Sequence, residues 1–315
     1  MDGSSGDGGL AVNAEFNSIW GVAVDSKGNV YISDGANEVV GKVDASTGII
    51  SNYAGNGSYG YSGDNGPAAS AQLFSPFGIA FDSSDNLYIA DRGNFVIRKV
   101  AASTGIITTI AGVAGISGLS GDGGPAALAT FDLPQSVAVD AFGDVYVGDD
   151  SDGHVRMISA SNGTIKTVAG GGTNRGEGVP AVTADIQPDG IAVDRTGTLY
   201  IGDRVHEGVR KVDPVTGLIT TIAGNGSYGS SGNGSATSGA LASPDAIAFS
   251  ASGQVYIGDY ADGAIHCVDP FTSLMYLVAG NPQFTSIVAI AFDSSGALYV
   301  ADGSARVVRR ITGIP

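Results

Sequence analysis

The chain of 315 residues has little charge and few of the residues that carry common chemistry. Charged residues make up only 15%, three residues are histidine, and the one cysteine, Cys267, excludes an internal disulfide. Fifteen basic residues stand against 31 acidic ones, and no basic run offsets the net charge of −16. This charge repels a phosphate backbone, so no nucleic-acid partner is expected. Apolar runs such as 287–292 are far shorter than the ~20 residues of a membrane helix, so no membrane insertion is expected either.

Glycine is the residue that the chain has in excess, at 50 of 315 positions, roughly twice the usual share. A hydrophobic content of 43% is too high for a disordered chain, and the glycines lack the every-third spacing of collagen. The opening residues contain neither a basic segment nor an apolar one of the kind found in export signals. Composition therefore predicts a turn-rich β protein and assigns no chemistry.

The dominant feature is an internal repeat that opens with a phrase of the type Gly-Val-Ala-Val-Asp. The six copies begin at Gly21, Gly78, Ser136, Gly190, Ala246 and Ala289. Each copy contains short β-branched or alternating runs bounded by turn residues, four of them in a full repeat. This pattern predicts an all-β, six-bladed β-propeller of four-stranded antiparallel blades in one domain over residues 1–315. The innermost strands are expected at Val22–Asp25, Ile79–Asp82, Val137–Asp140, Ile191–Asp194, Ile247–Ser250 and Ile290–Asp293.

One tyrosine recurs at the same place in the second run of every copy. The six are Tyr31, Tyr88, Tyr146, Tyr200, Tyr256 and Tyr299. A large ring at a fixed position is suited to packing between blades. We therefore predict a packing role for these rings rather than stacking on a ligand.

These motifs resemble the NHL-repeat family of six-bladed propellers over essentially the whole chain. The resemblance depends on the Gly-Val-Ala-Val-Asp opening, on Tyr-Ile-Ala-Asp at the end of the second run, and on Arg98-Lys-Val100 in the third. A narrower similarity links Ile106–Ala126 to the NHL arrays of bacterial secreted proteins and of teneurin ectodomains. The family includes RNA binders, protein-binding modules, kinase sensor domains and lyase-like enzymes, so the resemblance implies the fold and leaves the activity open.

The sixth blade is expected to lack its outer strand. Blades one to five each have a fourth run, the last of them near Leu274–Ala279, but the sixth copy ends after its third. The segment Ser5–Ala11 aligns with Ser120–Ala126, which follows a fourth strand, so it does not supply the missing one. An open edge is therefore predicted at Arg306–Thr312. Either the chain is a fragment of a longer precursor, which we favour, or a neighbouring molecule adds a strand and builds a fibre or oligomer.

Six aspartates end the second runs and form a tentative binding set at the channel mouth. They are Asp34, Asp91, Asp149, Asp203, Asp259 and Asp302. Carboxylates in a ring suit calcium, so a calcium site is the alternative to the expectation of no cofactor. The favoured interpretation is structural: each aspartate accepts hydrogen bonds from a turn, and Arg98, Arg156, Arg210 and Arg309 offer charge partners.

The histidines and the cysteine suggest no convergent catalytic set. His154, His206 and His266 occupy three different positions of the repeat, which disfavours a shared zinc ion, and no metal ligand is assigned. Cys267 is adjacent to His266 on an expected strand, where neighbouring side chains point to opposite faces, so it is predicted to be a packed thiol. The glycine-rich loops lack the helix and the Lys-Ser/Thr of a phosphate-binding loop. No catalytic residue is assigned.

The preferred function is a non-enzymatic extracellular binding or scaffold module. Its working surface is expected on the face that carries the long connections between blades, where a protein or glycan would bind. Four Asn-x-Ser/Thr sequons are possible glycosylation sites, namely Asn56, Asn162, Asn225 and Asn233. The alternatives are a fibre or oligomer subunit joined at the open sixth blade, and a metal-dependent lyase or lactonase at the channel mouth.

Overall fold

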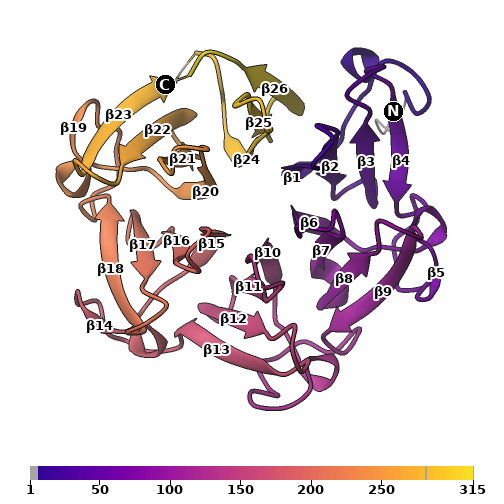
Figure 1. Ribbon diagram of the computed structural model, residues 1–315, viewed down its shortest axis with the longest axis horizontal. Helices are drawn as coiled ribbons and strands as arrows, with labels where there is room; N and C mark the ends of the chain where they lie inside the picture. The colour runs from indigo at the N-terminus through magenta and orange to yellow at the C-terminus, as the bar shows by residue number, and fades with distance from the viewer. Residues whose placement is uncertain (1–5, 281, 315) are drawn as a thin grey trace.

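The strands form six blades around a central channel (Figure 1). The computed structural model describes residues 6–280 and 282–314. The innermost strands are β1 (Ile19–Val24), β6 (Pro76–Phe81), β10 (Pro134–Val139), β15 (Pro188–Val193), β20 (Pro244–Phe249) and β24 (Ile287–Phe292). The second strands are β2 (Val30–Asp34), β7 (Leu87–Asp91), β11 (Val145–Asp149), β16 (Leu199–Asp203), β21 (Val255–Asp259) and β25 (Leu298–Asp302). The prediction of six blades is confirmed.

The third and fourth strands complete the blades toward the outside. The third strands are β3 (Val39–Val43), β8 (Val96–Val100), β12 (His154–Ile158), β17 (Gly208–Val212), β22 (Ala264–Asp269) and β26 (Val307–Ile311). The fourth strands are β4 (Ile50–Ala54), β9 (Ile106–Ala111), β13 (Ile165–Gly170), β18 (Leu218–Ala223) and β23 (Leu274–Ala279). Within the described residues the only helices are three-residue 3-10 turns: η1 (Ala11–Asn13), η2 (Ala68–Ser70), η3 (Arg92–Asn94), η4 (Ala126–Leu128), η5 (Ala181–Thr183) and η6 (Ala236–Ser238). None of these is long enough to cross a membrane.

The inner strands begin about three residues earlier than the repeat predicts. Strand β1 begins at Ile19 rather than Val22, and Ile19 pairs with Asp34 across an irregular register. The inner strands of the other five blades begin early in the same way. The repeated phrase does not include these first residues, although four of the six strands begin with a proline, namely Pro76, Pro134, Pro188 and Pro244. The residues that open onto the channel mouth lie in this part of each strand.

The connections between blades add short pairings outside the fourth strands. Strands β5 (Gly66–Pro67), β14 (Val179–Pro180) and β19 (Gly234–Ser235) pair with β9, β18 and β23. The N-terminal segment lies on blade one in the same manner, where Leu10 bridges Ile49. The alignment of residues 5–11 with a connection is thus matched for residues 6–11, while Ser5 lies outside the described residues. These extra pairings have no sequence signal of their own, because two residues are too few to show a period.

The tyrosines of the second strands pack between neighbouring blades, as predicted, and in three of the six places they meet an aromatic ring of the next blade. The ring of Tyr31 meets that of Phe81 on the next blade edge-on, with centroids 4.7 Å apart. Tyr200 and Phe249, and Tyr256 and Phe292, repeat this contact at 4.9 Å. The Tyr31 hydroxyl donates to Asp25 at the end of the inner strand, so the polar end of the ring is also satisfied.

Blade six has three strands, and within the described residues β26 pairs only with β25 (Figure 1). The prediction of an open edge at Arg306–Thr312 is confirmed. Arg309 shows the consequence, because it is exposed and forms no ion pair within the described part of the chain, whereas Arg98 and Arg156 at the same repeat position are fully buried. An unpaired edge of this kind is a template for an added strand.

An added strand is expected to complete blade six. Extending the chain after Pro315 with a copy of residues 105–112 restores the spacing of blade two and should raise the free energy of unfolding by about 2 kcal/mol, the value of burying one large aliphatic side chain. Hydrogen exchange should slow at the β26 amides. An extension carrying Asp at the position of Ile107 is the control and should do neither. Unchanged exchange at β26 with the unmodified extension would contradict the assignment of the edge.

Candidate functional site

The aspartates that end the second strands are structural supports placed behind the channel mouth. Each is at most 2% exposed, and none lines the channel. Each accepts a backbone N–H from the segment that enters the inner strand of its own blade, as Asp34 does from Ser18 and Asp149 from Leu133. The same bond joins Asp91 to Phe74, Asp203 to Gln187, Asp259 to Ala242 and Asp302 to Ser286. These contacts support the structural interpretation over a calcium site.

The arginine partners expected for these aspartates are present in two blades. Arg98 pairs with Asp91 at 3.3 Å, and Arg210 approaches Asp203 at 3.9 Å. Arg156 instead pairs with Asp122 in a connection, and Arg309 has no ion pair within the described residues. Burial raises the pKa of Asp91 and of Asp149 to about 6 in each case. The expected charge pairing is therefore a feature of particular blades rather than of the repeat.

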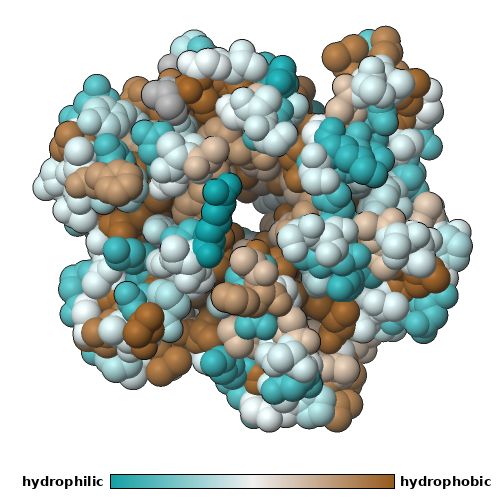
Figure 2. Space-filling view, viewed as in Figure 1, coloured by the Kyte–Doolittle hydropathy of each residue, from teal (hydrophilic) through white to brown (hydrophobic). Residues whose placement is uncertain are grey.

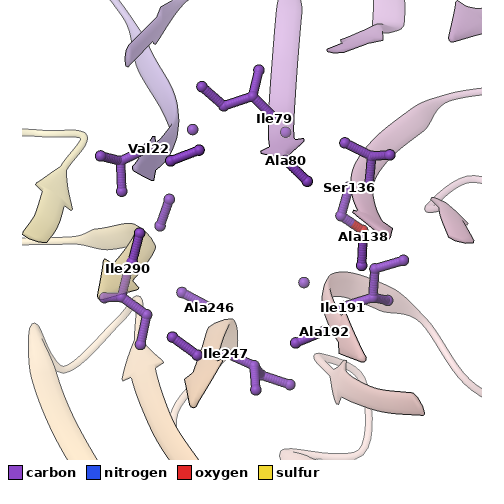
Figure 3. Close-up of a pocket in the computed structure, with 18 of the residues that line it drawn as sticks. Val22, Ile79, Ala80, Ser136, Ala138, Ile191, Ala192, Ala246, Ile247 and Ile290 are labelled. Carbon is purple, nitrogen blue, oxygen red and sulfur yellow. The ribbon is translucent and has the colours of Figure 1, made fainter. Parts of the chain in front are cut away.

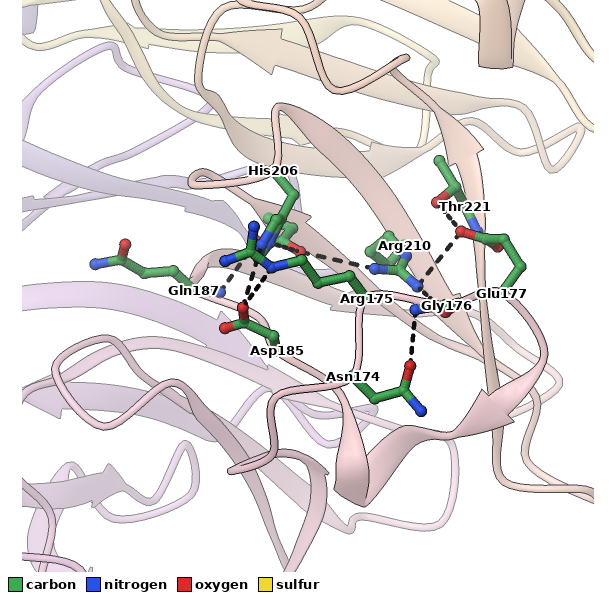
Figure 4. Close-up of polar contacts among 10 residues, drawn as sticks. Asn174, Arg175, Gly176, Glu177, Asp185, Gln187, His206, Arg210 and Thr221 are labelled. Atoms are coloured by element: carbon green, nitrogen blue, oxygen red, sulfur yellow. Dashed lines mark hydrogen bonds and ion pairs between the residues drawn. The ribbon is translucent and has the colours of Figure 1, made fainter.

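The three histidines lie apart from one another. The Nδ1 atom of His206 is 2.9 Å from the Asp203 carboxylate, within a polar network that includes Arg175, Asp185 and Glu177 (Figure 4). His154 contacts the backbone oxygen of Asp152. His266 is fully buried, and burial lowers its pKa, so it is a neutral side chain. In the described part of the chain, no three His, Cys, Asp or Glu side chains are grouped to hold a metal.

Cys267 and the sequons are placed as the sequence suggests. Cys267 is 1% exposed in the core, and burial raises its pKa, which keeps the thiol protonated. All four sequon asparagines are exposed. Asn56 and Asn225 each donate to a backbone oxygen of the same connection, which fixes both side chains in equivalent places. Glycosylation at these four positions stays a prediction.

The channel mouth itself is formed by residues that the repeat does not share. The second residue of each inner strand lines the channel at the face that carries the connections between blades. We call these six residues the mouth ring: Trp20, Phe77, Gln135, Asp189, Asp245 and Val288. Below the ring, the wall is built from Gly, Ala, Val, Ile and Phe, with Ser136 as the exception (Figure 3). The cavity measures about 340 Å³ and is open at the centre of the molecule (Figure 2).

The blade one and blade two side of the mouth ring is aromatic. Trp20 stacks on Phe77 with ring centroids 4.2 Å apart and planes 14° from parallel. The guanidinium of Arg92 lies 4.8 Å from the centre of the Phe77 ring. A Cβ at Gly35 would lie 2.8 Å from the Trp20 indole, so only glycine leaves room for this ring. Trp20 stays partly exposed at the mouth.

The opposite side of the mouth ring holds two carboxylates, one buried and one half-buried. Asp189 is 4% exposed and accepts a hydrogen bond from the Gln135 amide at 2.9 Å, while Arg204 lies 3.5 Å from its other oxygen. Asp245 is half-buried and accepts from the Ser243 hydroxyl at 2.9 Å. Burial and mutual repulsion raise the pKa of Asp245 well above its ordinary value, and burial raises that of Asp189. Each carboxyl therefore keeps its proton to a higher pH than a free aspartate does.

Sequence analysis missed the mouth ring. The six residues stand immediately before the phrase used to align the copies, and they are the place where the copies differ most in chemistry. That divergence is the signal that would have found them. A position that served only the fold would be expected to keep one type of side chain, whereas this one carries a tryptophan, a glutamine and two aspartates.

Comparison with known proteins agrees with the repeat pattern. No known family profile matches the chain. It is 25% identical to human NHL repeat-containing protein 2 over 90% of this chain and 42% of that protein. It is 26% identical to protein SUPPRESSOR OF QUENCHING 1, chloroplastic, of Arabidopsis thaliana over 85% of this chain and 27% of that protein. It is 28% identical to mouse teneurin-3 over 65% of this chain and 8% of that protein. The chain is a six-bladed β-propeller, and its repeats are consistent with those of NHL-repeat proteins.

Solved propellers share this fold at low sequence identity. An auxiliary nutrient binding protein of Bacteroides ovatus matches with a TM-score of 0.68 at 14% identity, over 95% of this chain and 70% of that one. A gluconolactonase of Xanthomonas campestris matches at 0.64 and 14%, over 96% and 87%. A chain of a nidogen–laminin complex matches at 0.61 and 14%, over 88% and 87%. These propellers include binding proteins and an enzyme. The chain described here spans less than half the length of the curated relatives that it matches.

Replacement of a supporting aspartate should destabilise the fold. Asp91→Ala removes the acceptor of the Phe74 amide and leaves the fully buried Arg98 with one carboxylate fewer, which should cost about 3–5 kcal/mol of unfolding free energy. Asp213→Ala, at an exposed turn, is the control and should cost much less, because solvent can replace the hydrogen bonds that are lost there. Denaturant unfolding checks both. A loss at Asp91 no larger than at Asp213 would count against the structural role.

The raised pKa of Asp245 predicts how stability changes with pH. The folded protein holds the Asp245 proton more tightly than the unfolded chain, so its contribution is complete below the unfolded pKa of about 4 and is lost as pH rises. Thermal unfolding followed from about pH 5 to about pH 9 should show a falling Tm. In Asp245→Asn, which cannot ionise at this position, the fall should be smaller. An equally steep fall in the variant would disprove the raised pKa of Asp245.

Proposed function

We propose that this propeller is a non-enzymatic binding module whose ligand, a protein or glycan, docks on the connection face at the channel mouth. The mouth ring supports this proposal, because it combines exposed aromatic surface with buried polar groups on a rigid scaffold. The mainly aliphatic wall beneath the ring leaves space for a ligand and carries few polar groups that could act in catalysis. No cofactor is required by this function.

The proposed setting is extracellular, as part of a longer protein. Teneurin-3 and the nutrient binding protein are the relatives that favour this setting. The four exposed sequons suit it as well, because glycans can be attached there without disturbing the core. Purification from a glycosylating secretory host followed by mass spectrometry of the sequon peptides tests this part of the proposal.

Two other functions are each favoured by one specific observation. An acid–base enzyme of the lyase or lactonase type is favoured by the raised pKa values of Asp189 and Asp245, since a carboxyl with a raised pKa can act as a general acid near neutral pH. A metal-dependent form of this chemistry would need ligands beyond this pair. Self-assembly is favoured by the open edge of β26.

A binding screen with matched variants tests the module proposal. Wild-type protein should bind members of a glycan array or an array of extracellular protein domains, and Trp20→Ala should weaken that binding about tenfold because it removes a large contact surface. Phe271→Ala removes an aromatic side chain that is 88% exposed at a turn between the third and fourth strands, on the opposite face, and serves as control. Equal loss in both variants would refute the mouth as the docking site. Turnover of a lactone panel that Asp245→Asn abolishes would establish the enzyme instead.

A further inference from the structure

The two sides of the mouth ring present opposite chemistries across the channel. Trp20 stands on blade one, while Asp189 and Asp245 stand on blades four and five. The negative face of an indole attracts the partly positive C–H bonds of a saturated ring. Carboxylates and amides instead bind hydroxyl groups. A ligand that satisfies both sides has an apolar face and a hydroxylated edge.

On the carboxylate side of the mouth ring, one buried oxygen of Asp189 has no hydrogen-bond donor within the described residues. The Asp189 side chain is 2% exposed, and within the described residues its Oδ2 atom accepts no hydrogen bond, although Arg204 lies 3.5 Å away. A buried oxygen without a donor costs free energy in the unliganded protein. A hydroxyl group entering the mouth would remove that cost. This unsatisfied oxygen points to a ligand that donates a hydrogen bond.

Charges of both signs surround the mouth ring. Arg204 lies 3.5 Å from Asp189, and the raised pKa of Asp245 favours its neutral form. Asp150, which also faces Asp189, is held by the Gln187 amide at 2.9 Å, and Arg92 lies over Phe77 on the aromatic side. Neither sign of charge dominates the whole mouth. This mixture favours a neutral ligand.

We infer that the mouth ring binds one neutral sugar ring, such as the terminal hexose of a glycan, with its C–H face on Trp20 and its hydroxyl groups on Asp189 and Asp245. This inference rests on the proposed binding function and narrows its ligand class. Asp189 accepts a sugar hydroxyl, the protonated Asp245 donates to another, and the Gln135 amide holds Asp189 in place. Both aspartates are binding residues, and Gln135 is a positioning residue.

Two glycines set the geometry of the site. Gly190 follows Asp189, and a Cβ there would lie 1.8 Å from the backbone oxygen of Asp245, so glycine allows blades four and five to approach closely. Gly35 leaves the space beside Trp20 on the other side of the mouth. Gly35→Ala should displace the indole and weaken sugar binding while the carboxylate pair stays intact.

Titration of defined sugars tests the inference. The probes are the methyl glycosides of glucose, galactose, mannose and N-acetylglucosamine, with glucosamine as a cationic and glucuronate as an anionic comparison, followed by calorimetry and saturation-transfer NMR. At least one neutral glycoside should bind in the millimolar range or tighter. Trp20→Ala and Asp189→Asn should each weaken it about tenfold or more. Phe142→Ala, an 80% exposed side chain at a turn between first and second strands, should leave it unchanged.

The pH profile separates a binding role of Asp245 from a structural one. Wild-type affinity should fall at alkaline pH, because ionised Asp245 can no longer donate and adds a second charge beside Asp189. Asp245→Asn should bind somewhat more weakly at neutral pH and lose this alkaline fall, since its amide donates at every pH. A wild-type profile that stays flat overturns the inference even if a variant fails to fold.

The remaining outcomes separate this inference from the proposed function. Tighter binding of glucosamine or glucuronate than of every neutral glycoside overturns the neutral-sugar ligand. Absence of binding by all the glycosides overturns it too, while a protein partner that Trp20→Ala still weakens would leave the binding module standing. If neither a sugar nor a protein binds to the connection face of the wild-type protein, both the sugar inference and the proposed binding function are refuted.

Discussion

A buried aspartate at the end of each second strand holds the chain where it enters the inner strand, and the channel mouth depends on this contact. Asp34 accepts the amide of Ser18, two residues before Trp20, and Asp203 accepts that of Gln187, two residues before Asp189. A buried carboxylate that accepts backbone N–H groups fixes the chain at that point. Moving it away would leave buried donors without an acceptor, which costs free energy. The mouth residues are therefore presented from fixed points around the ring.

This arrangement separates what the repeat must keep from what it can vary. The contact between the buried aspartate and the inner strand, the tyrosine packing and the alternating strands recur because every blade needs them. The contacts of Tyr31 and Tyr256 with the neighbouring blade illustrate this. The second residue of the inner strand faces the channel, so changes there do not disturb the packing between blades. Function can diverge at that one position while the propeller stays intact.

Blade six shows how much of a blade's stability depends on its outer elements. In blade three the connection covers Arg156, whose guanidinium also donates to the backbone oxygens of Thr130 and Ser120. Arg309, at the same position of blade six, is exposed, and among the residues that the structure describes neither a fourth strand nor a long connection covers it. The same residue type is thus buried or exposed according to its surroundings.

The sequence alone determined the number of blades, the four runs of a full repeat, the packing of the tyrosines and the open edge, because these follow from local periodicity and counting. It also favoured a structural role for the aspartates, which the contacts of Asp34 and Asp149 support. Only the tertiary structure brought Trp20 onto Phe77 and Asp189 beside Asp245, since these residues are about one repeat apart and no local pattern links them. The raised pKa values of Asp189 and Asp245 depend on the burial of the two side chains and on their distance from each other, and ring closure alone sets both.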